Sequence, residues 1–170
     1  MMIEVLMYIM MPASTLLVVL YLLMKERRRR DLLKRQDVCA KRITNIKESF
    51  RTTLELFSMQ RIIRPQHVKA MCNIVDNYFI DQPINEKNTR ELEALANRIS
   101  MTIAREVNMT KSDADTEWVK RKLLNFSLML PQQQQDYNRL FYRSRMKLLL
   151  KGLNTTRAKY VQTRHQQLAA

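Results

Sequence analysis

Glycine is nearly absent from this sequence, and proline is scarce. The 170 residues include one glycine, Gly152, and four prolines, whereas average usage would give roughly a dozen glycines and about eight prolines. Strands joined by tight turns need glycine or Asn-Gly at positive φ. The shortage argues against a turn-rich β fold and predicts an all-α chain with few, short loops. The length is enough for one modest domain and an appendage.

Residues suited to metal or catalytic chemistry are equally few. Cys39 and Cys72 lie 33 positions apart, and neither His67 nor His165 stands at ligand spacing from them, so a zinc site is not expected. One glycine cannot build a phosphate-cradling loop. Carboxylates two positions apart point to different sides of a helix and form no acid–base pair. We therefore expect no enzymatic activity, cofactor or metal, and we expect both thiols to be reduced core residues.

One long apolar run stands near the start of the chain. Residues 5–24 are twenty residues without a charge, enough to cross a bilayer as a helix. Ten of them are Leu, Ile or Val, each favouring insertion by about 0.3 to 0.6 kcal/mol, which outweighs the one proline and two hydroxyl side chains among them. No Lys or Arg precedes the run, so a cleaved signal peptide is not expected. The sequence predicts a transmembrane helix in residues 1–24, with a buried core helix as the alternative.

Five basic residues follow this run directly, namely Lys25, Arg27, Arg28, Arg29 and Arg30. Positive charge is retained on the cytoplasmic side of a membrane, so we expect a single-pass protein with its N-terminus outside and its C-terminus in the cytoplasm, in a bacterial inner membrane. Each basic residue near the surface also gains about 1 kcal/mol from anionic lipid headgroups. These residues are therefore the predicted contacts with the membrane surface.

The segment after the apolar run is predicted to continue as an amphipathic stalk helix over residues 25–63. Neither proline nor glycine occurs in residues 13–64. A 4-3 spacing marks one stripe of this helix: Leu32, Gln36, Cys39, Ile43, Ile46, Phe50, Thr53 and Phe57. The stripe is either a coiled-coil seam that makes a homo-oligomer through Cys39, Ile43, Ile46 and Phe50, or a face packed on the chain's own core. The two polar residues in the stripe weaken the seam.

Residues 64–170 are predicted to form a cytoplasmic bundle of about five further helices. The apolar residues repeat at helical spacing between polar or proline-containing breaks. The expected helices run from Pro65 to about Ile80, from Leu92 to Val107, from Ser112 or Asp113 to Leu130, from Pro131 to Gly152, and onward from Asn154 or Thr155. Gly152 is expected to end its helix in the left-handed conformation.

Net charge is distributed unevenly along the chain. Residues 25–51 hold eleven Lys or Arg against four acids, residues 52–136 hold eleven against eleven, and residues 137–170 hold eight against none. The stalk charge is explained by membrane topology. The C-terminal charge has no such explanation, because nothing near it needs to be oriented by the membrane.

The C-terminal basic residues are the predicted partner-binding site. Arg139, Arg143, Lys147 and Lys151 recur every four residues, beside an apolar face of Tyr137, Leu140, Phe141 and Leu148, and Arg157, Lys159 and Arg164 follow them. Like charges at this spacing repel one another. Anionic lipid, an acidic protein or RNA would relieve the repulsion. A basic face that contacts only solvent is the remaining alternative.

These features favour a non-enzymatic, membrane-anchored interaction or adaptor protein, a subunit of a larger membrane assembly. It would dock acidic protein partners or anionic lipid at the cytoplasmic face. One alternative is a membrane-tethered RNA- or ribosome-binding protein that uses the C-terminal charge on phosphates. Another is a regulator or immunity-type factor that acts on a second membrane protein.

Overall fold

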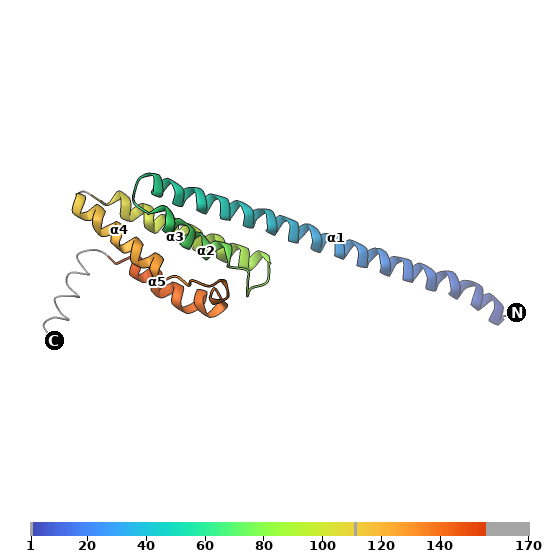
Figure 1. Ribbon diagram of the computed structural model, residues 1–170. Coiled ribbons are helices and arrows are strands. Elements are labelled where there is room, and N and C mark those ends of the chain that lie inside the picture. Colours follow the sequence, from blue (N-terminus) through green and yellow to red (C-terminus); the bar gives the residue numbers. More distant parts are fainter. Residues whose placement is uncertain (1, 111, 156–170) are drawn as a thin grey trace. The chain divides into compact units, whose positions relative to one another are not determined.

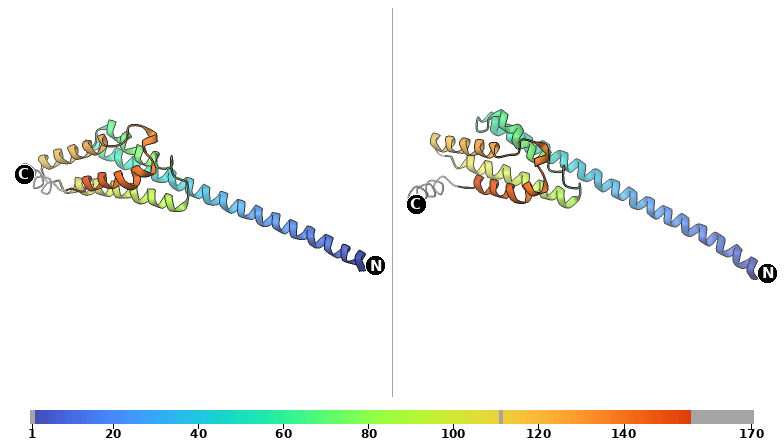
Figure 2. Two further views of the ribbon diagram at one scale, coloured as in Figure 1. Left: turned by 90° about the horizontal axis from the view of Figure 1, so that it is seen from below. Right: turned by 60° about the horizontal axis from the view of Figure 1, so that its bottom comes forward.

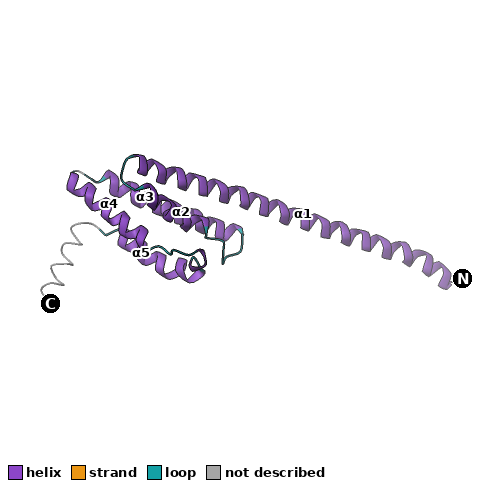
Figure 3. Cartoon of the chain, viewed as in Figure 1, coloured by secondary structure: helices purple, strands orange, loops and turns teal. Residues whose placement is uncertain are grey.

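All regular structure in the described residues is helical (Figures 1 and 3). The computed structural model describes residues 2–110 and 112–155, with side chains for residue 17 and from residue 19 onward. The α-helices of these residues are α1 (Met2–Met59), α2 (Pro65–Asp76), α3 (Glu86–Asn108), α4 (Asp113–Leu128) and α5 (Met146–Leu153). A 3-10 turn (Gln134–Asp136) and a π turn (Phe141–Arg145) precede α5. The all-α prediction is confirmed for this part of the chain.

The chain divides into two compact units, residues 1–41 and residues 42–170. The first unit is the N-terminal part of α1, whose backbone is helical through Pro12. Its described apolar side chains at positions 17 and 19–24 are all exposed, from 47% at Leu20 to 66% at Leu17. Most side chains of the predicted transmembrane helix lie outside the described residues. Among the residues that are described, no helix has the length and apolar character needed to cross a membrane.

The second unit has one hydrophobic core to which every helix contributes. Figure 2 shows the ribbons of α2 to α5 gathered together. Residues at spacings of three and four turn to the same side of a helix, which is why the apolar positions converge. The most deeply buried side chains are Leu54, Met71, Ile74, Val75, Leu92, Ile99, Ile103, Tyr137 and Met146. Helix α4 packs against α2, α3 and α5.

The apolar stripe of α1 enters this core. Ile43, Phe50 and Leu54 are buried, with 8%, 3% and 0% of their surface exposed, and Ile46 packs half-buried against them. Leu32, earlier on the predicted stripe, is 60% exposed. From Ile43 onward the stripe therefore packs within one chain, the second of the two alternatives. The buried side chains of Ile43 and Phe50 are not available for a coiled-coil seam in this fold.

The boundaries of α2 and α3 differ from those predicted. Helix α2 ends at Asp76 rather than near Ile80, and the next residues form turns. Helix α3 begins at Glu86, six residues before the predicted Leu92. The Asn85 side chain caps it by accepting a hydrogen bond from the Asn88 backbone N–H at 2.8 Å. The polar stretch predicted as a loop is therefore the capped first turn of the helix.

The predicted helix from Pro131 to Gly152 is wrong in its first half. The chain is irregular after Pro131, and helix resumes only near Arg139, at the π turn. A π turn places buried residues five positions apart, so Phe141 is followed in the core by Met146 and then by Leu150 and Leu153.

The π turn also corrects the predicted apolar face of this segment. Leu140 and Leu148, expected to be buried, are 72% and 70% exposed. Gly152 is not left-handed: it lies inside α5, and the helix ends at Asn154 with φ −84°. The last predicted helix was expected from Asn154 or Thr155 onward; neither of these residues is helical, and the rest of the segment lies outside the described residues.

A buried ion pair joins α3 to α4. The Lys122 ammonium lies 2.7 Å from a Glu106 carboxylate oxygen, with 8% and 11% of the two side chains exposed. Lys122 also donates to the backbone carbonyl of Thr155 at 2.7 Å. The pair thus holds the end of the described chain against two helices.

Removing one partner of this pair should be far more damaging than removing both. Replacing Lys122 with Met leaves the largely buried Glu106 carboxylate with only the exposed Arg105 guanidinium, 3.7 Å away, as a counter-charge. It should lower the free energy of unfolding by up to about 3 to 5 kcal/mol. The double variant Lys122→Met/Glu106→Leu should recover most of that loss. Urea denaturation followed by circular dichroism measures both. Equal destabilisation of the two variants would show that packing, and not the uncompensated charge, accounts for the loss.

Candidate partner-binding groove

Four of the predicted partner-binding residues lie at or beside a groove of about 620 Å³ in the second unit. One wall is residues 81–88, which are the end of the loop between α2 and α3 and the first turn of α3, and the other is the segment 139–147. Arg139, Arg143 and Lys147 line the groove, and Lys151 is exposed one helical turn further on. The fold therefore brings this basic block opposite a loop that is distant in sequence.

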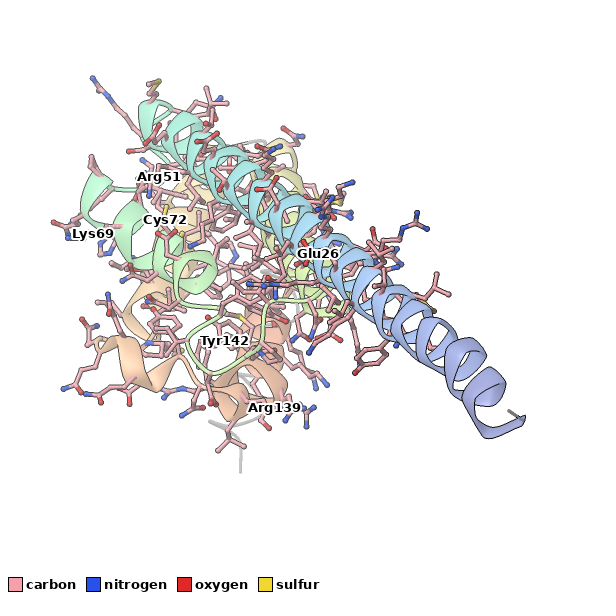
Figure 4. All side chains as sticks on the ribbon, turned by 90° about the vertical axis from the view of Figure 1, so that its right-hand side faces the viewer. Glu26, Arg51, Lys69, Cys72, Arg139 and Tyr142 are labelled. Carbon is pink, nitrogen blue, oxygen red and sulfur yellow. The ribbon has the colours of Figure 1, made fainter. Side chains whose placement is uncertain are left out.

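Backbone and side-chain hydrogen bonds fix the wall that carries the basic residues. The Arg139 backbone N–H donates to the Asp81 carboxylate across the groove at 3.1 Å. The Phe141 backbone N–H donates to the Asn138 side chain at 3.0 Å. The Tyr142 hydroxyl donates to the carbonyl of Ile74, in α2, at 2.7 Å. Figure 4 shows Arg139 at the surface and Tyr142 further inside.

Packed aromatic rings support the groove from below. Tyr78 and Tyr142 line it and meet edge to face with ring centroids 4.8 Å apart. Phe79, Phe141 and Tyr137 extend the cluster through contacts of 5.1 to 5.2 Å. Such contacts stabilise a fixed arrangement of rings. The basic side chains therefore project from a rigid support.

Burial raises the pKa of the tyrosines in this cluster. The pKa of Tyr137 rises to about 12 by desolvation. The pKa of Tyr78 also rises to about 12, by desolvation and by the charge of Glu91, to which its hydroxyl donates a hydrogen bond. Desolvation, with neighbouring Tyr137 and Tyr78, raises the pKa of Tyr142 as well. All three hydroxyls stay protonated at neutral pH.

The basic residues at the groove lack counter-charges. Arg139, Arg143, Lys147 and Lys151 are exposed, and within residues 2–110 and 112–155 none of them forms an ion pair. Residues 156–170 contain no Asp or Glu, so they offer no carboxylate side chain. By contrast, Arg42 of the same unit pairs with a Glu93 oxygen at 2.5 Å.

Two carboxylates make the groove mixed in charge. Asp81 and Glu91 line it together with a fourth cation, Lys87. Asp81 accepts the backbone N–H of Arg139, and Glu91 accepts the Tyr78 hydroxyl. Both acids are thus held in place by neutral donors and leave the basic side chains unpaired.

Apolar side chains are exposed next to these charges. Leu140 and Leu148 follow Arg139 and Lys147 directly in sequence and are 72% and 70% exposed. Ile80 and Ile84, in the opposing loop, are 52% and 51% exposed. Exposed apolar side chains therefore accompany the exposed charges on both walls of the groove.

The other predicted site residues are not among those that line the groove. Lys25 and the four arginines 27–30 are in the first unit and are exposed, with Arg30 paired to Glu26 at 3.2 Å. Arg157, Lys159 and Arg164 lie outside the described residues. Cys39 and Cys72 are free and buried, as predicted. Burial raises the pKa of the Cys72 thiol, although a hydrogen bond with nearby Arg51 (Figure 4) opposes the rise.

A second basic recess was not predicted from the sequence. Arg61 and Arg64, in the turn between α1 and α2, line a cavity of about 340 Å³ together with Lys120 and Arg121 of α4. Residues 52–136 contain equal numbers of acidic and basic residues, so their net charge gave no sign of this recess. A net charge does not show which residues are close together in the fold. The repeated arginines of the sequence Arg61-Ile-Ile-Arg64 were the available signal.

No family model matches the chain, and no curated protein or solved structure is significantly similar to it.

The buried tyrosines should make the fold sensitive to alkali. Their pKa in the unfolded chain is about 10 and in the folded chain about 12 for Tyr78 and Tyr137. The contribution to stability is therefore complete below pH 10 and is lost as the pH rises toward 12. The urea midpoint, measured from pH 8 to 12, should fall over this range, and Tyr142→Phe should fall less steeply. A parent and variant with equal slopes would contradict a role for Tyr142 ionisation.

Proposed function

We propose that this chain is a non-enzymatic, membrane-anchored adaptor that docks an acidic segment of a partner protein in the groove between residues 81–88 and 139–147. The observation that carries the proposal is the row of exposed cations without counter-charges along one recessed surface, beside exposed leucines. Electrostatic complementarity of this kind selects a partner and speeds its association.

The mixed charge of the groove favours a protein partner over a polyanion. Asp81 and Glu91 lie among the basic residues and would repel the closely spaced phosphates of nucleic acid or of lipid headgroups. A polypeptide with alternating acidic and other residues meets both signs of charge. Leu140 and Leu148 provide apolar contact area for such a segment.

The aromatic residues do not favour the RNA-binding alternative. Unpaired bases are usually held by stacking on exposed aromatic rings. Tyr137 and Phe141 are buried in the core, and Tyr142 is half-buried with its hydroxyl bonded to Ile74. These three described rings, which alternate with arginine in the sequence, therefore pack within the protein.

The membrane anchor is proposed from residues 5–24. This run has no charge, and all of its described side chains, at positions 17 and 19–24, are exposed. A continuous apolar surface around a helix is costly in water and favourable in hydrocarbon. The basic residues from Lys25 to Arg30 support an orientation with residues 42–170 in the cytoplasm.

A topology assay tests the anchor. Alkaline phosphatase, which is active only outside the cytoplasm, should be inactive when fused after Ala170 of the full chain, whereas green fluorescent protein at the same place should fluoresce. The reason is that Lys25 and Arg27–Arg30 hold the C-terminal side in the cytoplasm. The proteins should sediment with membranes and resist extraction by carbonate. Phosphatase activity in the C-terminal fusion would contradict the proposed orientation.

Photo-crosslinking tests the groove. A benzophenone amino acid replacing Leu140, which is 72% exposed, should crosslink in living cells to a protein with an acidic segment. The variant Arg143→Gln/Lys147→Gln should reduce the crosslinked product, since each exposed charge pair contributes up to about 1 kcal/mol and two correspond to up to about thirty-fold in affinity.

The matched control is Lys69→Gln/Arg98→Gln, which removes two exposed charges outside the groove. It should leave the crosslinked product unchanged. Crosslinks to lipid or RNA in place of protein would overturn the choice of partner. Equal yields from both double variants would show that the groove does not recognise charge.

A further inference from the structure

We propose that the cavity at the α1–α2 turn binds a small molecule that carries two or more linked phosphate groups. This site is separate from the groove. Its walls are the turn 61–64 and the middle of α4, and its polar lining is Arg61, Arg64, His67, Glu117, Lys120 and Arg121. The cavity volume of about 340 Å³ is within the range of small-molecule sites.

Positive charge in the cavity exceeds negative charge by three, from four cations and one carboxylate. The one acid, Glu117, is paired with Lys120 at 2.8 Å. Hydrogen bonding and charge from Lys120, with the charges of Arg121 and Arg64, lower the pKa of Glu117. The basic residues line the cavity from both the turn and α4. Within the described part of the chain, Arg61, Arg64 and Arg121 form no ion pair.

The backbone at Arg61 is held in a conformation that disfavours its side chain. Helix α1 ends with the Ile62 N–H donating to the Phe57 carbonyl at 3.0 Å and the Arg61 N–H donating to the Ser58 carbonyl at 2.9 Å. This is a Schellman motif, whose left-handed position is usually glycine. Arg61 occupies it with φ 59°.

The conformation at Arg61 indicates a use for its side chain. A non-glycine residue in the left-handed region is strained, and strained residues cluster at functional sites. Glycine would relieve the strain and remove the guanidinium from the cavity. The adjacent Ile63 is buried, with 3% exposed, and anchors the turn in the core. Arg61 and Arg64 therefore lie on either side of a residue that is held in the core.

A hydrogen-bonded histidine completes the lining. The Ser127 hydroxyl donates to the Leu124 carbonyl at 2.7 Å, so its oxygen accepts from Nδ1 of His67 at 2.9 Å. The other ring nitrogen, Nε2, then accepts from the Gln66 amide at 3.2 Å. The ring orientation is therefore set by groups outside the cavity.

Phosphate chemistry fits this lining better than carboxylate chemistry. Guanidinium groups bind phosphate oxygens through two parallel, charge-assisted hydrogen bonds. Three arginines and a lysine can contact several phosphate oxygens at once. A single carboxylate or phosphate would leave most of the charge uncompensated, so linked phosphates are the expected ligand.

Titration calorimetry with inorganic tripolyphosphate tests the site, using the full chain in neutral-lipid nanodiscs. One molecule per chain should bind, and citrate, which also carries several negative charges, should bind at least ten-fold more weakly. If adenosine triphosphate binds at least as tightly as tripolyphosphate, the ligand is a nucleotide. If it binds more weakly, the ligand is a linked phosphate without a base. Both results support the site. Citrate bound as tightly as tripolyphosphate would overturn it.

Arg61→Gly should separate stability from binding. Because glycine relieves the left-handed strain, the melting temperature should be equal to or higher than that of the parent, while tripolyphosphate binds about ten- to hundred-fold more weakly. Arg121→Gln, on the other wall, should weaken binding similarly without changing the backbone. Arg143→Gln/Lys147→Gln, in the groove, is the matched control and should bind as the parent does. Unchanged affinity in both Arg61→Gly and Arg121→Gln, or lost affinity in the groove variant, would overturn the assignment.

Discussion

Burial of one face of α1 is the contact on which the second unit depends. Ile43, Phe50 and Leu54 lie in the same core as the interior residues of α2 to α5. Without that face, the remaining helices would lose a wall of their core, and isolated helices as short as α2 and α5 are marginal in water. Packing of α2 beside this face also separates the recesses, because the turn at 61–64 precedes α2 and the groove loop follows it.

Local periodicity was sufficient to predict most helices but not the segment before α5. The apolar spacing in α3, from Leu92 to Ile103, is regular and its helix formed as expected. From Pro131 to Arg145, the structure depends on non-local bonds, such as Arg139 to Asp81 and Tyr142 to Ile74. The resulting π turn changes the spacing of buried residues. The 3.6-residue period of an α-helix therefore does not predict which leucines are exposed.

A basic surface could be predicted from the sequence where one segment contains many basic residues and no acids. It could not be predicted where two distant segments each contribute a few basic residues. Residues 137–170 contain no acid, so the basic wall of the groove was evident. Its opposing loop was not, because pairing with residues 81–88 requires the fold. The α1–α2 cavity was missed for the same reason, since its arginines at 61 and 64 meet α4 only after folding. Counting charges along the sequence detects segments of one charge. It does not detect charged residues that are distant in sequence and close in the fold.

Helix α2 links the two recesses, and its packing argues that they act independently. Arg64 and His67 at its start line the cavity, while Tyr78, just after its end, lines the groove. Coupling between two sites requires an element with two arrangements whose equilibrium both ligands shift. Met71 and Ile74, in the middle of α2, are fully buried, and a shift of the helix would disrupt close packing around both. A helix held in this way fixes the position of each recess, so we expect occupancy of one to leave the affinity of the other unchanged.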